Sequence, residues 1–154
     1  GDPFQPTPSL VEKLLGHCIV SLSCSEFHNV AVTKEGKCFA WGNGQYGVLG
    51  IGDPSSLPKD EDGDPYQPTP TLIEGLSAFK IVQVASSEMH NLAVTAEGKV
   101  FAWGSRKFVP GFCMHTKDCH ACKHLVAGDV LLPVPVQVLA GHVVYQVATH
   151  SSFE

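Results

Sequence analysis

The sequence HNVAVT at residues 28–33 recurs almost unchanged as HNLAVT at residues 90–95. Working outward from these two stretches, residues 2–42 and 64–104 align without a gap and are identical at 25 of 41 positions, with an offset of 62. Self-similarity at a fixed spacing is the sequence signature of repeat proteins, in which each copy forms one equivalent unit. The sequence therefore predicts at least two copies of one structural unit.

A third copy begins near Pro133. The sequence VYQVA at residues 144–148 matches IVQVA at residues 81–85 with an offset of 63. The chain therefore contains about 2.5 repeats, divided as repeat 2–63, repeat 64–104, an insert at 105–130 and a partial repeat at 131–154.

Each repeat is expected to form an antiparallel meander. Three short runs of apolar, largely β-branched residues predict strands, and a Pro-rich segment that resists helix is expected to lead into them in extended form. Three-residue connections with Gly in third position suit a hairpin turn in which that Gly takes a positive φ. In the second repeat the predicted strands are Lys80–Ala85, His90–Thr95 and Lys99–Trp103, the turn is Ala96–Gly98 and the extended segment is Gln67–Pro70, while Lys34–Gly36 repeats the turn.

A meander of three or four strands cannot bury both of its faces alone. Stacked copies predict an all-β fold, a partial β-propeller of about 2.5 blades, with a β-solenoid as the less favoured alternative. Trp41 and Trp103 are then expected to pack between blades. Because a closed ring needs at least four blades, we expect other blades of a longer protein or assembly to cover the ends.

Composition limits the function classes. The chain is 44% hydrophobic and 16% charged, with a net charge of -5, which disfavours nucleic-acid binding because phosphate contacts need basic surfaces. No apolar run is long enough to span a membrane, and no signal peptide is evident, so we expect an intracellular protein, with the cytoplasm favoured over cytoskeletal, ciliary or nuclear sites. The six Cys are interpreted as thiols or metal ligands.

The repeat resembles that of the regulator of chromosome condensation family, a seven-bladed propeller. The sequence NGQYGVLGIG at residues 43–52 matches the family's Gly-Gln-x-Gly-x-Leu-Gly-x-Gly motif. His28 and His90 match the family His, and Trp-Gly pairs at 41–42 and 103–104 match its Trp-Gly pair. The resemblance covers roughly residues 1–104 and 131–154 and implies a seven-bladed ring.

Three departures from the family pattern stand out. The Gly three residues before the family His is Ser25 and Ser87 here. The second repeat lacks the Gly-rich run, and Phe153 stands where the third His is expected. Because His28 and His90 occupy repeated positions, we interpret both as half-buried scaffold residues satisfied by backbone groups, without a catalytic role.

The insert contains a candidate zinc site. Cys119 and Cys122 have the two-residue gap that lets two thiolates bind one tetrahedral ion, with Cys113 and His124 as further ligands and His115 as another nearby candidate. Haem attachment would need His directly after Cys122, and a thioredoxin-like setting is absent. A strong zinc signal has two such pairs, so a loop of reduced Cys and His without metal is the simpler interpretation. At most one zinc ion per chain is expected, and no other cofactor.

The insert is also locally basic. Over residues 105–127, Arg106, Lys107, Lys117 and Lys123 against Asp118 give a net charge of +3 on an otherwise acidic chain. Such a loop could steer the chain toward an acidic partner, so these four residues are partner-binding candidates. A solvated loop with incidental charge is the simpler interpretation.

A second, acidic loop at residues 53–64 suggests calcium binding at first sight. The EF-hand spacing fails, because the required Gly falls on Pro65 and the closing Glu on Thr71. We interpret this segment as a solvated loop between blades.

No catalytic motif is apparent. The sequence has no Gly-x-Ser-x-Gly and no phosphate-binding Gly-Lys-Ser/Thr run. We therefore expect a non-enzymatic propeller scaffold that binds other proteins or the remaining blades of its own ring. The alternative, implied by the resemblance to the family's namesake, is a guanine nucleotide exchange factor for a small GTPase.

Overall fold

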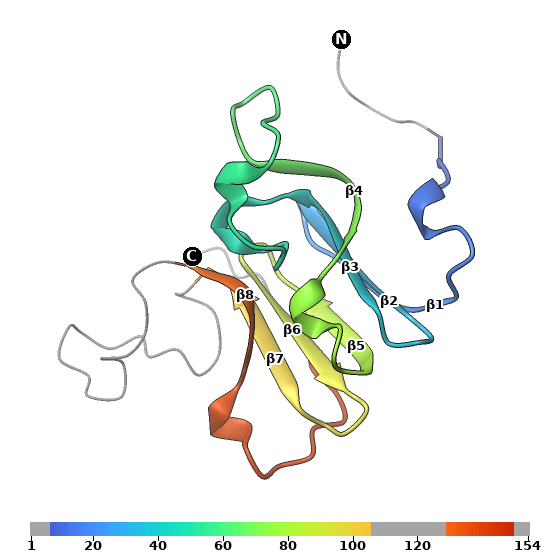
Figure 1. Ribbon diagram of the computed structural model, residues 1–154, viewed down its shortest axis with the longest axis vertical. Helices are drawn as coiled ribbons and strands as arrows, with labels where there is room; N and C mark the ends of the chain where they lie inside the picture. Colours follow the sequence, from blue (N-terminus) through green and yellow to red (C-terminus); the bar gives the residue numbers. More distant parts are fainter. Residues whose placement is uncertain (1–6, 106–128, 150–154) are drawn as a thin grey trace, which may run out of the picture.

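The computed structural model describes residues 7–105 and 129–149, which form two four-stranded antiparallel sheets (Figure 1). Blade 1 has the strand order β1 (Ile19–Cys24), β2 (His28–Thr33), β3 (Cys38–Asn43) and β4 (Tyr66–Leu72). Blade 2 has the order β5 (Ile81–Ser86), β6 (His90–Thr95), β7 (Val100–Gly104) and β8 (Val130–Pro135). The all-β fold class is confirmed.

The helical elements of the described residues are all single 3-10 turns. They are η1 (Glu12–Leu14), η2 (Gln45–Gly47), η3 (Pro54–Ser56), η4 (Glu74–Leu76) and η6 (Gln137–Leu139). None is long enough to span a membrane.

The two blades have the same register. Asn29 lies opposite Trp41 in blade 1, and Asn91 lies opposite Trp103 in blade 2. Both first strands have an irregularity one residue after their Ile, and both third strands have one just before the Gly of the Trp-Gly pair. Repeated sequence therefore produces repeated structure down to single-residue irregularities.

The Gly of each Trp-Gly pair is required by a close approach of backbone. Gly42 and Gly104 have φ values of +111° and +116°, and a Cβ on either would lie 2.5 Å from a carbonyl oxygen of the preceding hairpin turn. The residue after each Gly donates its N–H to that same carbonyl, at 2.9 Å in blade 1 and 2.7 Å in blade 2. The predicted hairpin glycines, Gly36 and Gly98, also have positive φ, as expected.

The Pro-rich segment is extended, as predicted, but it belongs to the other blade. Residues 67–70 lie in β4, which pairs with β3 and forms one edge of blade 1 rather than leading into blade 2. Edge strands tolerate proline because the missing N–H faces no partner strand. Each sheet therefore takes its last strand from residues that follow the end of its own sequence repeat.

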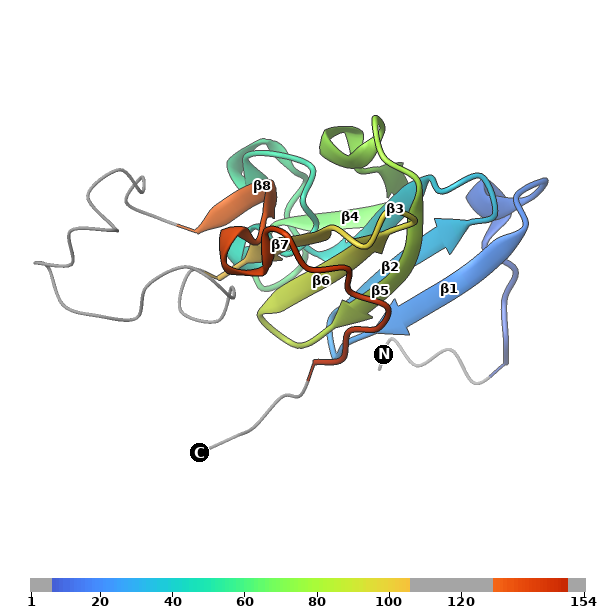
Figure 2. The same cartoon turned by 90° about the horizontal axis from the view of Figure 1, so that it is seen from below.

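The blades pack face to face. β5 lies against β1 and β2, so the first strands of the two sheets lie side by side (Figure 2). Their facing side chains form one hydrophobic core that contains Val30, Val32, Ile81, Val94 and Trp103. Each sheet therefore buries one of its faces against the other sheet.

Residues 144–148, whose sequence matches residues 81–85 of β5, do not form a strand. Val144 N–H donates to the Gly98 carbonyl at 3.0 Å, as Ile81 N–H does to Gly36 at 3.2 Å. The Gln83 side chain donates to the Val147 carbonyl at 2.9 Å and accepts from its N–H at 3.2 Å. This segment therefore lies on blade 2 as β5 lies on blade 1, without a strand partner among the described residues.

Candidate functional site

The two repeated histidines are held by serine side chains. His28 Nδ1 lies 2.8 Å from Ser25 Oγ, and the His28 N–H donates to the same oxygen at 3.1 Å. His90 repeats both contacts with Ser87, at 2.7 and 3.2 Å. For His28 the expectation that backbone groups satisfy the ring was wrong, because side chains contact both of its nitrogens, the Ser25 hydroxyl at Nδ1 and an amide at Nε2.

His28 also reaches across the blade interface. Its Nε2 lies 2.9 Å from Asn91 Oδ1, and Asn91 Nδ2 donates to the Val48 carbonyl at 2.7 Å. Trp103 Nε1 donates to that same carbonyl at 2.8 Å. We call these four residues the inter-blade junction; all of them are buried.

The junction determines the tautomer of His28. A carbonyl only accepts, so the amide nitrogen of Asn91 faces Val48 and its oxygen faces His28 Nε2, which must carry the proton. In the neutral ring, Nδ1 then accepts from the Ser25 hydroxyl. Both ring nitrogens are therefore engaged, and burial lowers the pKa of His28, while the Asn91 hydrogen bond raises it in part. Burial also lowers the pKa of His90.

These contacts hold the hairpin turn that precedes each histidine. The Ser25 oxygen accepts backbone N–H groups and lies 3.1 Å from the His28 carbonyl, and the His28 ring is 1% exposed. His28 is more buried than predicted, whereas His90 is half-buried as predicted. The prediction that the tryptophans pack between blades is confirmed for Trp103; Trp41, at the equivalent position, is half-buried.

The face of blade 1 that turns away from blade 2 is open. Leu22 is 58% exposed, whereas Val84 at the equivalent position of blade 2 is 5% exposed because blade 1 covers it. The other face of β1 is covered by blade 2, because Ser21 and Ser23 accept backbone N–H groups of β5. The open face thus presents apolar side chains that are buried in the other repeat.

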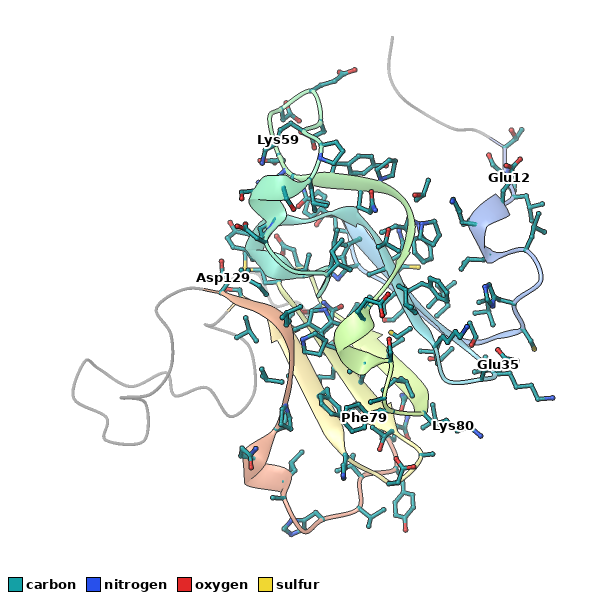
Figure 3. All side chains as sticks on the ribbon, in the orientation of Figure 1. Glu12, Glu35, Lys59, Phe79, Lys80 and Asp129 are labelled. Atoms are coloured by element: carbon teal, nitrogen blue, oxygen red, sulfur yellow. The ribbon has the colours of Figure 1, made fainter. Side chains whose placement is uncertain are left out.

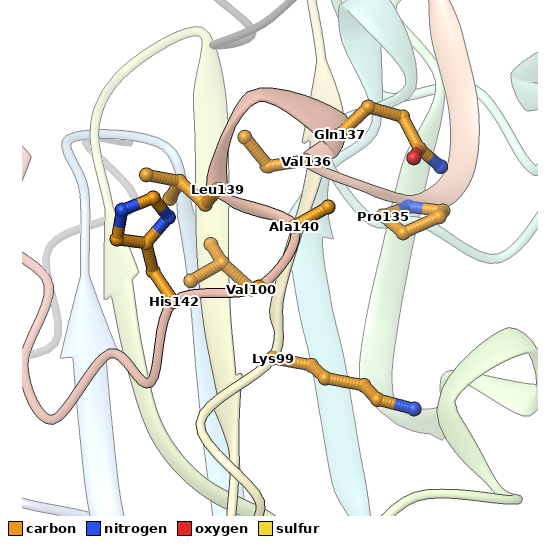
Figure 4. A pocket seen from close by; sticks show the side chains of 9 residues that line it. Lys99, Val100, Pro135, Val136, Gln137, Leu139, Ala140 and His142 are labelled. Carbon is orange, nitrogen blue, oxygen red and sulfur yellow. The ribbon is translucent and has the colours of Figure 1, made fainter.

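A hollow of about 290 Å³ lies at the far end of blade 2 (Figure 4). Its apolar side chains are those of Val100, Pro135, Val136, Leu139 and Ala140, and its titratable side chains are those of Lys99 and His142. In blade 1 the residue equivalent to His142 is Phe79, labelled in Figure 3, and its ring packs on Phe101 of blade 2 at 4.6 Å. The equivalent position beside blade 1 is therefore filled by its neighbour, blade 2, whereas beside blade 2 it is a hollow.

The insert candidates lie outside the described residues. Cys113, Cys119, Cys122 and His124 for zinc, and Arg106, Lys107, Lys117 and Lys123 for partner binding, all fall between residues 106 and 128. Both assignments stay predictions. Outside that segment, residues 7–105 and 129–149 bring no three His, Cys, Asp or Glu side chains together as a metal site.

The acidic loop connects β3 and β4 of blade 1, not two blades as expected. Asp60 Oδ1 accepts the N–H groups of Asp62 and Asp64, at 3.1 and 2.8 Å. Asp53 Oδ1 accepts the Ser55 N–H at 2.8 Å, and this contact lowers the pKa of Asp53. These carboxylates stabilise turns.

Sequence reasoning missed two members of the junction, Asn91 and Val48. A signal for Asn91 was present, because Asn follows His in both repeats. Val48 acts through its carbonyl, so its side chain gave no signal.

Comparison with known families and sequences agrees with this geometry. The family described as "Regulator of chromosome condensation (RCC1) repeat" matches residues 35–94, and a second profile of that description matches residues 19–48. Protein pim1 of Schizosaccharomyces pombe is 42% identical over 102 residues, which are 64% of this chain and 19% of pim1. The ultraviolet-B receptor UVR8 of Arabidopsis thaliana is 39% identical over 101 residues, 65% of this chain and 21% of UVR8.

Solved structures show the same fold. Human WBSCR16 superposes with a TM-score of 0.66 and 23% identity over 88% of this chain and 29% of that one. Prp20p of Saccharomyces cerevisiae, in a structure described with its binding to Gsp1p and histones, superposes with a TM-score of 0.59 and 21% identity over 79% of this chain and 26% of that one. The chain thus spans about a fifth to under a third of the relatives it matches.

Proposed function

Because the chain belongs to the regulator of chromosome condensation (RCC1) repeat family, we propose that it is part of a non-catalytic β-propeller scaffold that binds other proteins. The observation that carries the proposal is the open face of blade 1. Leu22 is 58% exposed there, against 5% for its equivalent Val84. Burying such a leucine contributes about 1.5–3 kcal/mol, so this face favours a protein neighbour.

The chemistry of the described residues supports a scaffold. The serine and histidine pairs that could suggest catalysis serve the hairpin turns and the inter-blade junction instead. On propellers the blades are occupied with packing, so binding is placed on exposed faces and connecting loops.

A photo-crosslinking residue in place of Leu22 tests this proposal in cells that express the protein. We expect crosslinks to a defined polypeptide, either further blades of the same protein or a separate partner. The matched control carries the same group in place of Glu61, which is exposed in the acidic loop of blade 1. Crosslinks of equal yield and identity from both positions would overturn the proposal.

Guanine nucleotide exchange on a small GTPase is the second candidate. It is favoured by the likeness to Prp20p, whose structure is described with binding to Gsp1p. The test is the release of fluorescent GDP from a panel of small GTPases by the full-length protein. Acceleration that is lost on deleting residues 106–126 would place exchange above the scaffold role.

Zinc binding by the insert is a separate proposal. We expect at most one zinc ion per chain, held through Cys119 and Cys122. Elemental analysis of protein prepared without chelator, compared with the Cys119→Ser variant, measures it. Equal zinc content in both proteins, or none in either, would remove this assignment.

A further inference from the structure

A second, smaller hollow lies between the two blades, next to the inter-blade junction. Its volume is about 80 Å³. Blade 1 contributes Phe27 from its first hairpin turn and Tyr46 from η2, and blade 2 contributes Glu88 and Met89 from the equivalent turn. Asn43, Gln45, His28 and Val48 complete the lining.

The aromatic side chains of this hollow face solvent. Phe27 is 52% exposed and Tyr46 is 44% exposed. Tyr46 has a φ of +56°, the only positive value of a non-Gly residue in the described chain. This conformation costs about 1 kcal/mol or more for a bulky residue, and such outliers cluster at sites of function. The surrounding turn fixes it, because Asn43 Oδ1 accepts the Gln45 N–H at 2.8 Å.

The polar chemistry of the hollow selects for a cation. Glu88 is half-buried and forms no ion pair with any residue in ranges 7–105 and 129–149. His28 stays neutral near pH 7, because burial lowers its pKa, so the ring does not oppose a positive charge. An apolar occupant would desolvate the carboxylate without compensation, and an anion would be repelled by it.

Size and shape narrow the occupant further. Cofactor and small-molecule pockets have volumes of roughly 300–1,000 Å³, so a hollow of about 80 Å³ suits one side-chain head group. A guanidinium stacks on aromatic faces and binds a carboxylate through two parallel hydrogen bonds, which an ammonium group cannot do. We propose that this hollow binds an arginine side chain of a partner protein, an inference that deepens the scaffold function proposed above.

The direct test is a titration of the full 154-residue chain with N-acetyl-arginine methylamide, followed by NMR. We expect shifts centred on the Met89 methyl group and the rings of Phe27 and Tyr46. Glu88→Gln should weaken binding roughly twofold to fivefold, since it leaves the aromatic contacts in place and removes an ion pair that contributes about 0.5–1 kcal/mol. Glu26→Gln is the matched control, because Glu26 occupies the equivalent turn position of blade 1 but does not line this hollow.

Two further probes test whether binding requires a positive charge and whether it requires a guanidinium group. The neutral N-acetyl-citrulline methylamide should give no localised shifts, and N-acetyl-lysine methylamide should bind more weakly than the arginine probe. Equal binding of the lysine and arginine probes, equal weakening by Glu26→Gln and Glu88→Gln, or no localised shifts would each overturn the assignment.

The Leu22 crosslinking experiment separates this proposal from the broader one. Defined crosslinks from Leu22, combined with a failed arginine titration, would overturn only the assignment of the hollow. A localised arginine titration without defined Leu22 crosslinks would support the hollow and overturn the scaffold role at the open face.

Discussion

Replacement of Asn91 by alanine should destabilise the fold through the inter-blade junction. The change removes the acceptor of His28 Nε2 and one of the two donors to the Val48 carbonyl. A buried ring N–H without an acceptor costs about 1–3 kcal/mol, and loss of the second hydrogen bond costs about 1 kcal/mol because Trp103 still donates to Val48. The free energy of unfolding should fall by roughly 2–4 kcal/mol.

Urea unfolding followed by tryptophan fluorescence measures this loss as a lower midpoint at an unchanged slope. Asn29→Ala is the matched control, because Asn29 occupies the same register position but is only half-buried, and its effect should stay within about 0.5 kcal/mol. A double-mutant cycle with His28→Leu separates the hydrogen bond from the cavity, and it should give a coupling energy of about 1 kcal/mol or more. A loss below about 1 kcal/mol for Asn91→Ala, or equal losses in both Asn variants, would refute the role assigned to the junction.

Three other results are expected. Because burial lowers the pKa of His28 below its usual 6.5, the folded state binds fewer protons than the unfolded state. The stability from this ring is therefore present above about pH 6.5 and is lost as the pH falls toward the lowered value, as NMR titration of the ring and urea midpoints at several pH values should show. Gly50→Ala should lose roughly 1–3 kcal/mol more than Gly63→Ala, since both residues have positive φ but only a Cβ on Gly50 would meet the buried indole, at 2.8 Å; equal urea midpoints would contradict this. Burial raises the pKa of the Cys38 thiol, so a disulfide reagent should modify it only on unfolding, whereas the exposed Cys24 should react in the native state; native modification of both, by mass spectrometry, would contradict the packing.

The repeat made most of the fold predictable from the sequence. HNVAVT and FAWG recur with one offset, and the structure gives both copies the same register and the same hairpin glycines. It also places Trp103 between the blades, as predicted. The prediction of the sheet to which residues 67–70 belong was wrong. Extended prolines are compatible with either end of a meander, and only tertiary pairing with β3 decides between them.

The junction was less predictable than the fold. Its contacts join residues 43, 55 and 63 positions apart, and one of them ends on a backbone carbonyl. Repetition identifies equivalent residues but does not show which residue of one copy meets which residue of the next. The open-face exposure of Leu22 was also hidden, because its equivalent Val84 has the same apolar character in the sequence.

The inter-blade junction is asymmetric, because the earlier and the later blade contribute different groups to it. Blade 1 contributes a ring N–H and a carbonyl, whereas blade 2 contributes an amide and an indole. Tandem copies of one gene segment would therefore encode neighbouring units whose contacting groups are already complementary. The insert interrupts this symmetry, because the second repeat lacks the Gly-rich run that in the first repeat contains Val48 and Gly50. The two units are therefore not interchangeable, and a gene with their order reversed should encode a poorly matched pair.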